Sequence, residues 1–278
     1  MVFIFVNDEI GYNKKMNKFK NTILLLNFNF SEDLINLHLW ADLYSSFFKK
    51  VIVYSDFPKH TSYPNVNYVE TQKGFFTYNI FTHFYENYME DIKNSDGIFY
   101  TQDDCVFNIN SIKNFDLNSC YGPPGLAKSK IPTTNTIGIR DINQDYRDWS
   151  VWSSTNGLTA LNNALKLLDI KKISYGFSDF FYLPRRMWTS NFIDFLKISY
   201  KTELFLEIAI PTILVNMEGG GGIYTIYPHK ILWGTDREFS NKKLIEWIED
   251  GISVIHPVKL RSNPDLKKGL KFLMSHSV

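Results

Sequence analysis

Short apolar runs alternate with amphipathic stretches through the first half of the chain. The runs at 22–30 (TILLLNFNF), 51–56 (VIVYSD), 65–70 (NVNYVE) and 97–101 (GIFYT) predict strands, because short runs bounded by polar and turn residues are typical of buried strands. Between 78 and 92 the apolar positions step by three and four residues, which predicts a helix. Such alternation predicts an α/β fold, in which a mostly parallel sheet carries helices on both faces.

A further helix is expected directly after the first strand. Ser31 can cap it, and Glu32 and Asp33 fall in its first turn, where the helix dipole favours negative charge. One face of this helix would carry an apolar stripe made of Ile35, Leu39, Leu43 and Phe47. The stripe predicts that the helix packs on one face of the sheet.

The second half of the chain is less regular. Helices are predicted over 157–169 (GLTALNNALKLLD), over 189–199 (TSNFIDFLKIS) and over 203–214 (ELFLEIAIPTIL), the last one ended by Pro211. The aromatic-rich segment at 175–188 is predicted to be a loop beside the sheet.

Length and composition favour one domain with an elaborated lobe. The chain has 278 residues, of which 44% are hydrophobic, and this is enough for one large core. We expect an N-terminal extension over 1–21 and a single domain over 22–278, whose two halves are 22–115 and 116–278.

Charge and cysteine content argue against several classes of protein. The 30 Lys and Arg residues against 29 Asp and Glu residues leave a net charge of +1, so no global field favours nucleic acid and no nucleic-acid partner is expected. Cys105 and Cys120 are too few for a disulfide scaffold and lack the spacing of zinc ligands. Apolar runs also stay well below the roughly 20 residues of a membrane span. We therefore expect a soluble, cytoplasmic protein with no membrane span.

The predicted strand at 97–101 leads directly into Gln102, Asp103 and Asp104. Two adjacent carboxylates repel each other unless a cation or hydrogen-bond donors compensate them. The plain explanation is a polar turn before the next segment. The alternative is a site for a divalent cation and a diphosphate, because ligands of open α/β sheets bind beyond the carboxyl ends of the strands.

This order of elements, with an apolar strand that ends in an acidic motif, resembles the nucleotide-sugar glycosyltransferases of the GT-A fold. The likeness covers roughly residues 22–260. In the style of its sequence and the order of its motifs, the chain resembles most the small glycosyltransferases that large DNA viruses encode. In that family a DxD motif holds Mn²⁺ or Mg²⁺ against the donor diphosphate. Gln102-Asp103-Asp104 departs from the motif at its first acid. The resemblance implies that Asp104 is the direct metal ligand and that Asp103 serves the ribose or a metal-bound water.

The C-terminal segment IHPVKL adds two candidates to this site. Several GT-A enzymes bring a C-terminal histidine to the metal and a nearby lysine to the diphosphate, and the resemblance implies these roles for His256 and Lys259. Neutral imidazole suits Mn²⁺, and an ammonium group neutralises a leaving phosphate. A solvated strand end is the alternative for both residues.

On the acceptor side, the segment SDFFYLP resembles the part of these enzymes that places an acid near the acceptor hydroxyl. Asp179 is therefore the candidate catalytic base, and a carboxylate that caps a local turn is the alternative. Glu207 is a reserve candidate, for which a salt-bridged structural role is the alternative. The resemblance also implies nucleotide contacts at Asp56, Asn27 and Asn29, which follow or end the first two strands.

The resulting hypothesis is a GT-A-like enzyme whose C-terminal half forms an acceptor-binding lobe. It would transfer a hexosyl or deoxyhexosyl group from a nucleoside diphosphate, UDP first among them, to a hydroxyl of a glycan or protein acceptor, with Mn²⁺ or Mg²⁺ as cofactor. If the protein is viral, we expect it in the host cytoplasm or in the virus factory. Two alternatives stay open: a non-catalytic glycan-binding or virion-associated protein on a decayed transferase fold, and a nucleotidyltransferase. The latter would be expected to carry a Gly- or Arg-rich phosphate loop, and LLLNFNFSED contains none.

Overall fold

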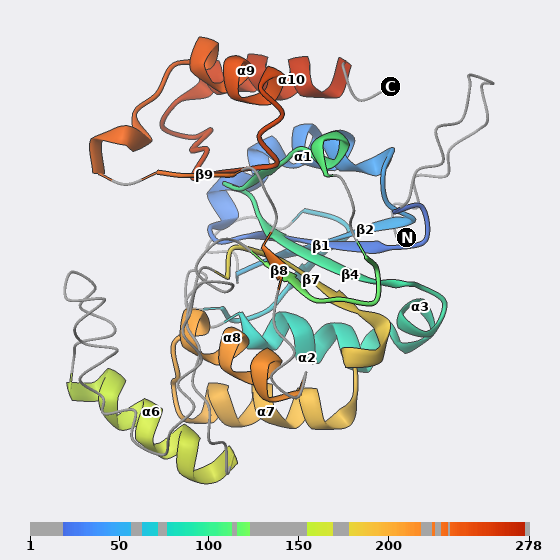
Figure 1. The fold of residues 1–278 in the computed structure, drawn as a ribbon, viewed down its shortest axis with the longest axis vertical. Helices are drawn as coiled ribbons and strands as arrows, with labels where there is room; N and C mark the ends of the chain where they lie inside the picture. Colours follow the sequence, from blue (N-terminus) through green and yellow to red (C-terminus); the bar gives the residue numbers. More distant parts are fainter. Residues whose placement is uncertain are drawn as a thin grey trace.

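The computed structural model of the protein describes residues 19–56, 63–71, 77–112, 116–122, 155–168, 178–217, 224–225, 229–232 and 234–275. Most of the predicted N-terminal extension lies outside these ranges, so its structure stays a prediction. Within them the chain forms an α/β fold with a mixed, mostly parallel sheet between layers of helices (Figure 1).

The main sheet has seven strands in the order β3-β2-β1-β4-β7-β6-β8. Strands β3, β2, β1 and β4 run parallel to one another, whereas β7 runs antiparallel to both β4 and β6. From β1 the chain moves outward to β2 and β3 on one side, and β4 lies on the other side of β1. The strands are β1 (Ile23–Phe28), β2 (Lys50–Ser55), β3 (Val66–Tyr68), β4 (Gly97–Gln102), β6 (Tyr121–Gly122), β7 (Phe180–Pro184) and β8 (Tyr224–Thr225).

Two layers of helices cover the sheet. On one face, at the top of Figure 1, lie α1 (Leu37–Ser45), α9 (Asn241–Glu249) and α10 (Lys267–Ser275). The other face is covered by α2 (Tyr78–Asn87), α7 (Ser190–Lys201) and α8 (Leu206–Met217), and α6 (Thr155–Leu168) lies outside them. The short helix α3 (Met89–Lys93) leads from α2 into β4. No helix in the described part of the chain has the length and apolar character that a bilayer span requires.

A second, three-stranded sheet attaches the C-terminal segment to the end of β4. Its order is β5-β10-β9, made of β5 (Val106–Phe107), β9 (His229–Ile231) and β10 (Val254–His256). β5 begins two residues after Asp104 and pairs with β10, Ile255 opposite Val106. Because the pairing is antiparallel, the end of β10 returns to the turn that follows β4.

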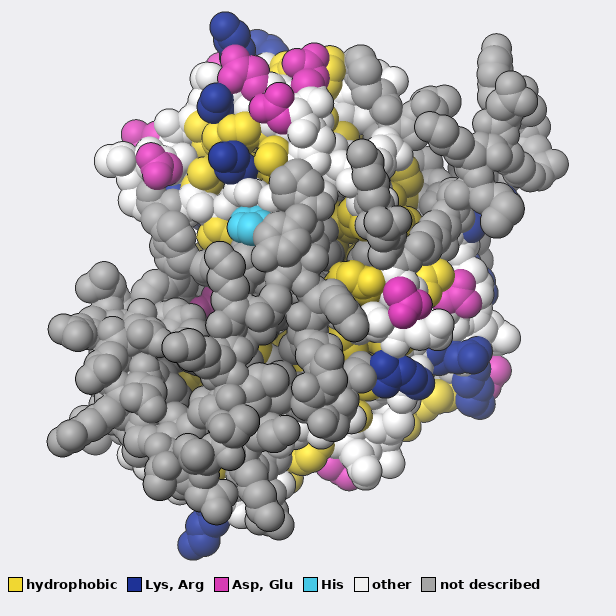
Figure 2. Space-filling model, viewed as in Figure 1, with side chains coloured by type: hydrophobic (Ala, Val, Ile, Leu, Met, Phe, Trp, Pro, Cys, Tyr) yellow, Lys and Arg dark blue, Asp and Glu magenta, His cyan; other side chains and the backbone are white. Residues whose placement is uncertain are grey.

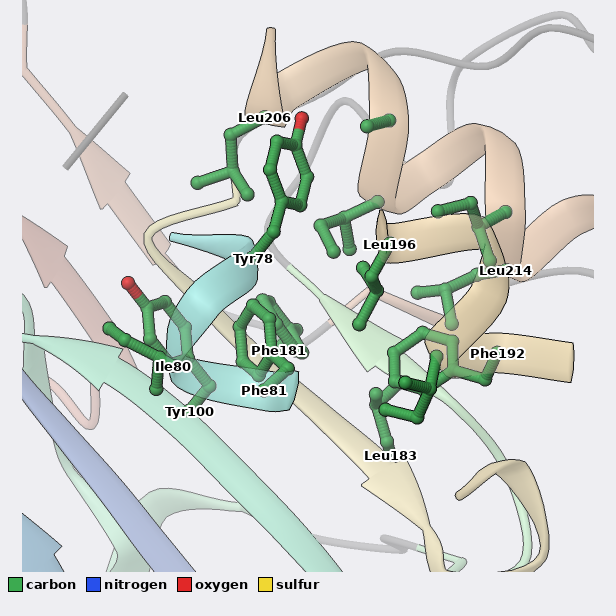
Figure 3. Packing of buried hydrophobic residues seen from close by; sticks show 14 of the residues in the cluster. Tyr78, Ile80, Phe81, Tyr100, Phe181, Leu183, Phe192, Leu196, Leu206 and Leu214 are labelled. Carbon is green, nitrogen blue, oxygen red and sulfur yellow. The ribbon is translucent and has the colours of Figure 1, made fainter. Parts of the chain in front are cut away.

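Each central strand contributes to two cores, because successive side chains point to opposite faces. In β4, Ile98 and Tyr100 belong to the core under α2, α7 and α8, while Phe99 belongs to the core under α1, α9 and α10. Figure 3 shows the first of these cores, where Tyr100 and Phe181 come from the sheet and Phe81 from α2. Burial on both faces explains why these strands consist of apolar runs rather than alternating patterns.

The short 3-10 helices complete the chain trace. They are η1 (Ser31–Asn36), η2 (Ile109–Ser111), η3 (Arg185–Met187), η4 (Gly234–Arg237) and η5 (Pro264–Leu266). The predicted cap at Ser31 is wrong, because Ser31 is the first residue of η1 and no side chain caps that turn. The predicted stripe also fails at its first position, since Ile35 is 74% exposed.

Two other predictions about the second half were wrong. The segment at 175–188 contains β7, whose residues Phe180 to Pro184 are all buried, instead of a loop. The helix around Glu207 does not end at Pro211, because α8 continues past it to Met217, and Glu203 lies before the helix with a positive φ of 56°. Tertiary packing thus overrides the local signal of a proline: α8 has apolar neighbours on several sides, with Ala209, Ile210 and Leu214 fully buried.

The contact between β4 and β7 gives a test of this packing. Gly97 faces β7 so closely that an added Cβ would lie 2.6 Å from the carbonyl oxygen of Leu183 and against the ring of Tyr182. We expect Gly97→Ala to lower the free energy of unfolding by about 1–3 kcal/mol, because overpacking forces strand and ring apart. Urea unfolding measures the change, with Lys201→Ala at an exposed position as control. A Gly97→Ala protein within about 0.5 kcal/mol of the parent would contradict this packing.

Candidate functional site

The ends of β1 and β4 and the start of β7 meet at one edge of the main sheet. Asp103 and Asp104 form the turn directly after β4, as predicted. Asp179 directly precedes β7, and because β7 is antiparallel to β4 its first residues lie at this same edge. The backbone N–H of Gln102 donates to the carbonyl oxygen of Asp179 at 3.0 Å, which fixes the two segments side by side.

The C-terminal segment closes the site from the other sheet. His256 is the last residue of β10, and its peptide bond to Pro257 is cis. The backbone N–H of Val258 then donates to the carbonyl oxygen of Asp104 at 2.6 Å. The segment IHPVKL therefore lies against the turn after β4, although Asp104 and Lys259 are 155 positions apart in the chain.

Four charged side chains converge at this junction. The Lys259 ammonium donates to Asp104 Oδ2, and Nε2 of His256 lies 3.4 Å from Asp104 Oδ1 and 3.8 Å from Asp179 Oδ2. Only 8% of the Asp104 side chain is exposed, against 52% for Lys259. Asp104 is thus a buried carboxylate between an ammonium group and an imidazole rather than part of a solvated turn.

These contacts shift the pKa values of the cluster in opposite directions. Burial alone would raise the pKa of Asp104, but His256 and Lys259 together outweigh it and hold that pKa well below its usual range. Burial and the nearby Asp104 raise the pKa of Asp179, for which His256 compensates only in part. Burial would lower the pKa of His256, but Asp179 and Asp104 raise it above the ordinary histidine value. Asp104 is therefore held as an anion, while Asp179 is poised to accept a proton.

A chain of amide groups joins the ends of β1 and β4 beside this cluster. Asn27 Nδ2 donates to Asn29 Oδ1 at 2.8 Å, and Asn29 Nδ2 donates to Gln102 Oε1 at 2.6 Å. Gln102 is buried. An amide at position 102 can thus accept the hydrogen bond from Asn29 without adding a further negative charge beside Asp103 and Asp104.

A pocket of about 130 Å³ opens next to the cluster. It lies between the loop after β1, the Asp103-Asp104 turn and the segment after β10. Its lining residues are Asn29, Phe30, Asp33, Asn36, Asp103, Asp104 and the stretch from Val258 to Ser262. Burial, followed by the Asp104 charge, raises the pKa of Asp103 well above its ordinary value. The pocket stands at the point where the strand order turns from β1 to β4, which is where open α/β sheets bind ligands.

The structure brings together most of the predicted site residues but not all of them. Asp103, Asp104, Asp179, His256 and Lys259 converge, and Asn29 lines the pocket beside them. Asn27 is fully buried and does not line that pocket. Asp56 also lies away from it, because its carboxylate accepts a hydrogen bond from the Thr71 backbone N–H at 2.9 Å and ties β2 to the segment after β3.

The side chains of Tyr182, Trp188 and Glu207 lie outside the cluster and are buried. Two aromatic side chains in the segment predicted to be a loop, Tyr182 and Trp188, are buried in the core. Glu207 lies at the start of α8 and is 9% exposed, and no ion pair joins it to another of the described residues. Burial, and then the Asp179 charge, raises the pKa of Glu207 well above its ordinary value.

The pocket residues that the sequence argument did not identify as part of a site include Phe30, Asp33, Asn36 and Arg261. Asp33 was explained only as a carboxylate in the first turn of a helix, although it follows the same strand as Asn29. Arg261 stands two positions after Lys259, so the proximity of two cations to a predicted phosphate site was a usable signal.

Within the described residues, no group of three or more His, Cys, Asp or Glu side chains has the arrangement of a metal site. Figure 2 shows one face of the molecule, on which acidic and basic side chains are interspersed rather than gathered by sign. That distribution agrees with the net charge of +1.

No known protein-family model matches the chain, and no curated protein is detectably similar to it in sequence.

The raised pKa of Glu207 gives a pH-dependent prediction. The folded state favours the neutral acid, whereas the unfolded chain ionises near about 4.3, so the stability that Glu207 contributes at low pH is lost as the pH rises through its folded pKa. We expect Glu207→Gln to raise the free energy of unfolding at pH 8 relative to the parent, and to do so less at pH 5.

Urea unfolding at both pH values measures this difference, and Glu203→Gln is the matched control, since Glu203 is exposed and lies four residues earlier. A gain that is the same at pH 5 and pH 8 would show that Glu207 titrates normally.

Proposed function

We propose that the protein is a metal-dependent glycosyltransferase with a GT-A-like fold, which transfers a sugar from a nucleoside diphosphate, UDP first among them, to a hydroxyl of a glycan or protein acceptor. The observation that carries the proposal is the convergence of Asp104, Asp179, His256 and Lys259 beside a pocket at the β1/β4 switch point. Transfer from a diphosphate needs a site for a cation, a group that neutralises the leaving diphosphate and a proton acceptor, and Asp104 with His256, Lys259 and Asp179 can supply these.

The donor set beside this pocket suits a hard divalent cation. Oδ1 of Asp104 is buried and accepts no hydrogen bond within the described residues, and the imidazole of His256 lies next to it. Mg²⁺ is usually bound by one or two carboxylates, with waters and substrate phosphates as the other ligands, so a cage of three protein ligands is not required. Asp104 and His256 would hold the ion, which when bound would supply Lewis-acid stabilisation of the leaving diphosphate.

The other side chains have distinct tasks in this proposal. Lys259 neutralises charge that develops on the leaving diphosphate, and Asp103 binds the ribose or an ordered water. Asp179 takes the proton of the acceptor hydroxyl while the acceptor oxygen bonds to the sugar and the bond from sugar to diphosphate breaks. The raised pKa of Asp179 supports this task, because a general base works best when its pKa approaches the working pH.

The donor side is tested by thermal shift with a panel of nucleotide sugars, with and without Mn²⁺. Ligand at 100 times its Kd stabilises the native state by about 2.7 kcal/mol, so we expect a higher melting temperature only when a UDP-sugar and Mn²⁺ are both present. In Asp104→Asn we expect this shift to disappear, because the variant loses the only charge that the turn presents to the cation as a stable anion.

Asp104→Asn will also melt at a lower temperature without ligand, since it leaves His256 and Lys259 without their counter-charge. Each protein is therefore compared with its own ligand-free baseline. Asp42→Asn, at an exposed position in α1, is the control. An unchanged Mn²⁺-dependent shift in Asp104→Asn would remove Asp104 as the metal ligand.

The acceptor side is tested by the rate of transfer. We expect Asp179→Asn to lower kcat by about 10²- to 10⁴-fold while the donor Kd stays nearly constant, because a general base acts on the acceptor. Asp194→Asn, exposed in α7, should leave both quantities unchanged. Normal kcat in Asp179→Asn would exclude Asp179 as the base, and the absence of both transfer and UDP-sugar hydrolysis in the parent protein would favour a non-catalytic binding protein.

A further inference from the structure

Arg261 lines the pocket and is held in place by two neighbours from the loop after β1. Its Nε lies 3.5 Å from Asp33 Oδ1, and its guanidinium carbon stands 5.1 Å from the centre of the Phe30 ring. A guanidinium group prefers such a position over an aromatic face. The Phe30 ring and the Asp33 carboxylate together restrict where the guanidinium group can lie.

The same contacts leave the other edge of the guanidinium available. Asp33 engages Nε alone, and the two terminal nitrogens donate to no side chain or backbone group within the described residues. The Arg261 side chain is 54% exposed, whereas Asp33 is 13% exposed. The structure thus presents a preorganised pair of N–H donors at the pocket, in the planar fork that matches two oxygens of a phosphate.

Lys259 lies two residues before Arg261 and lines the same pocket, so two cations bracket it. The pocket also contains the three carboxylates of Asp33, Asp103 and Asp104. A divalent cation at Asp104 would offset the negative charge of these carboxylates, so an anionic ligand would bind together with the cation rather than alone.

We propose that Arg261, positioned by Asp33 and Phe30, is a phosphate-binding residue, and that it and Lys259 together bind two linked phosphoryl groups. The inference rests on the proposed function in its choice of ligand, since it assigns the diphosphate of the donor to this pocket. Lys259 contacts one phosphoryl group as a point charge, and Arg261 contacts the other through its fork. The pocket is therefore selective for a diphosphate over a monophosphate.

Calorimetric titration with inorganic pyrophosphate and with inorganic phosphate, both in Mn²⁺ buffer, tests this assignment. In Arg261→Gln we expect the affinity for pyrophosphate to fall by about 10-fold or more, which corresponds to about 1.4 kcal/mol, and the affinity for phosphate to change far less. Arg261→Lys should recover only part of the loss, because an ammonium group has no bidentate fork.

Arg185→Gln is the matched control, because Arg185 follows the opposite end of β7 and donates to the Lys93 carbonyl oxygen. Circular dichroism confirms that each variant is folded. Pyrophosphate affinity in Arg261→Gln equal to that of the parent, or an equal loss for phosphate and pyrophosphate, would overturn the assignment.

The result separates this inference from the proposed function. If pyrophosphate binding depends on Arg261 but no nucleotide sugar is cleaved or transferred, the diphosphate site stands and the glycosyltransferase proposal falls. If sugar transfer is measured and Arg261→Gln keeps the parent's pyrophosphate affinity and donor KM, the transferase stands and the role of Arg261 falls.

Discussion

A carboxylate that leaves water must be surrounded by cations or hydrogen-bond donors, and Asp104 meets this condition with groups from the far end of the chain. His256 ends β10 and Lys259 follows it, and the hydrogen bond from the Val258 backbone N–H to the Asp104 carbonyl oxygen keeps this segment in place. The end of β4 and the C-terminal segment are therefore one electrostatic unit. Removing either partner would leave a buried charge behind, which is more costly than losing an exposed contact.

The sheet topology assembles the rest of the site around this unit. The parallel strands β1 and β4 end at the same edge of the sheet, so Asn29 after β1 and Asp103 and Asp104 after β4 lie together there. β7 runs the other way, so its first residues stand at that edge and bring Asp179 there. Because β7 is reversed, Asp179, which precedes its strand, lies next to Asp103 and Asp104, which follow theirs.

The sequence predicted the first half of the fold well because each strand there is a local apolar run, and strong local patterns survive tertiary packing. It also predicted that His256 and Lys259 return to the end of β4, although only through a family resemblance. It failed for β7, because an aromatic-rich segment with a proline at its end looks the same in a loop and in a buried strand. It failed for Ile35, whose helical spacing was correct but whose turn is a 3-10 helix at the surface. Arg261 was missed because its position over Phe30 depends on two segments that only the folded chain brings together.

Burial of β1, β4 and β7 on both faces has a consequence for how the chain can vary in length. Inserting or deleting one residue inside any of these strands would exchange the side chains of the two cores, since neighbours point to opposite faces. It would also displace Asn29, Asp104 or Asp179 along the strand by about 3.3 Å, more than a hydrogen bond tolerates. Indels in natural variants of this protein should therefore be confined to the connections between elements, while the lengths of these three strands stay constant.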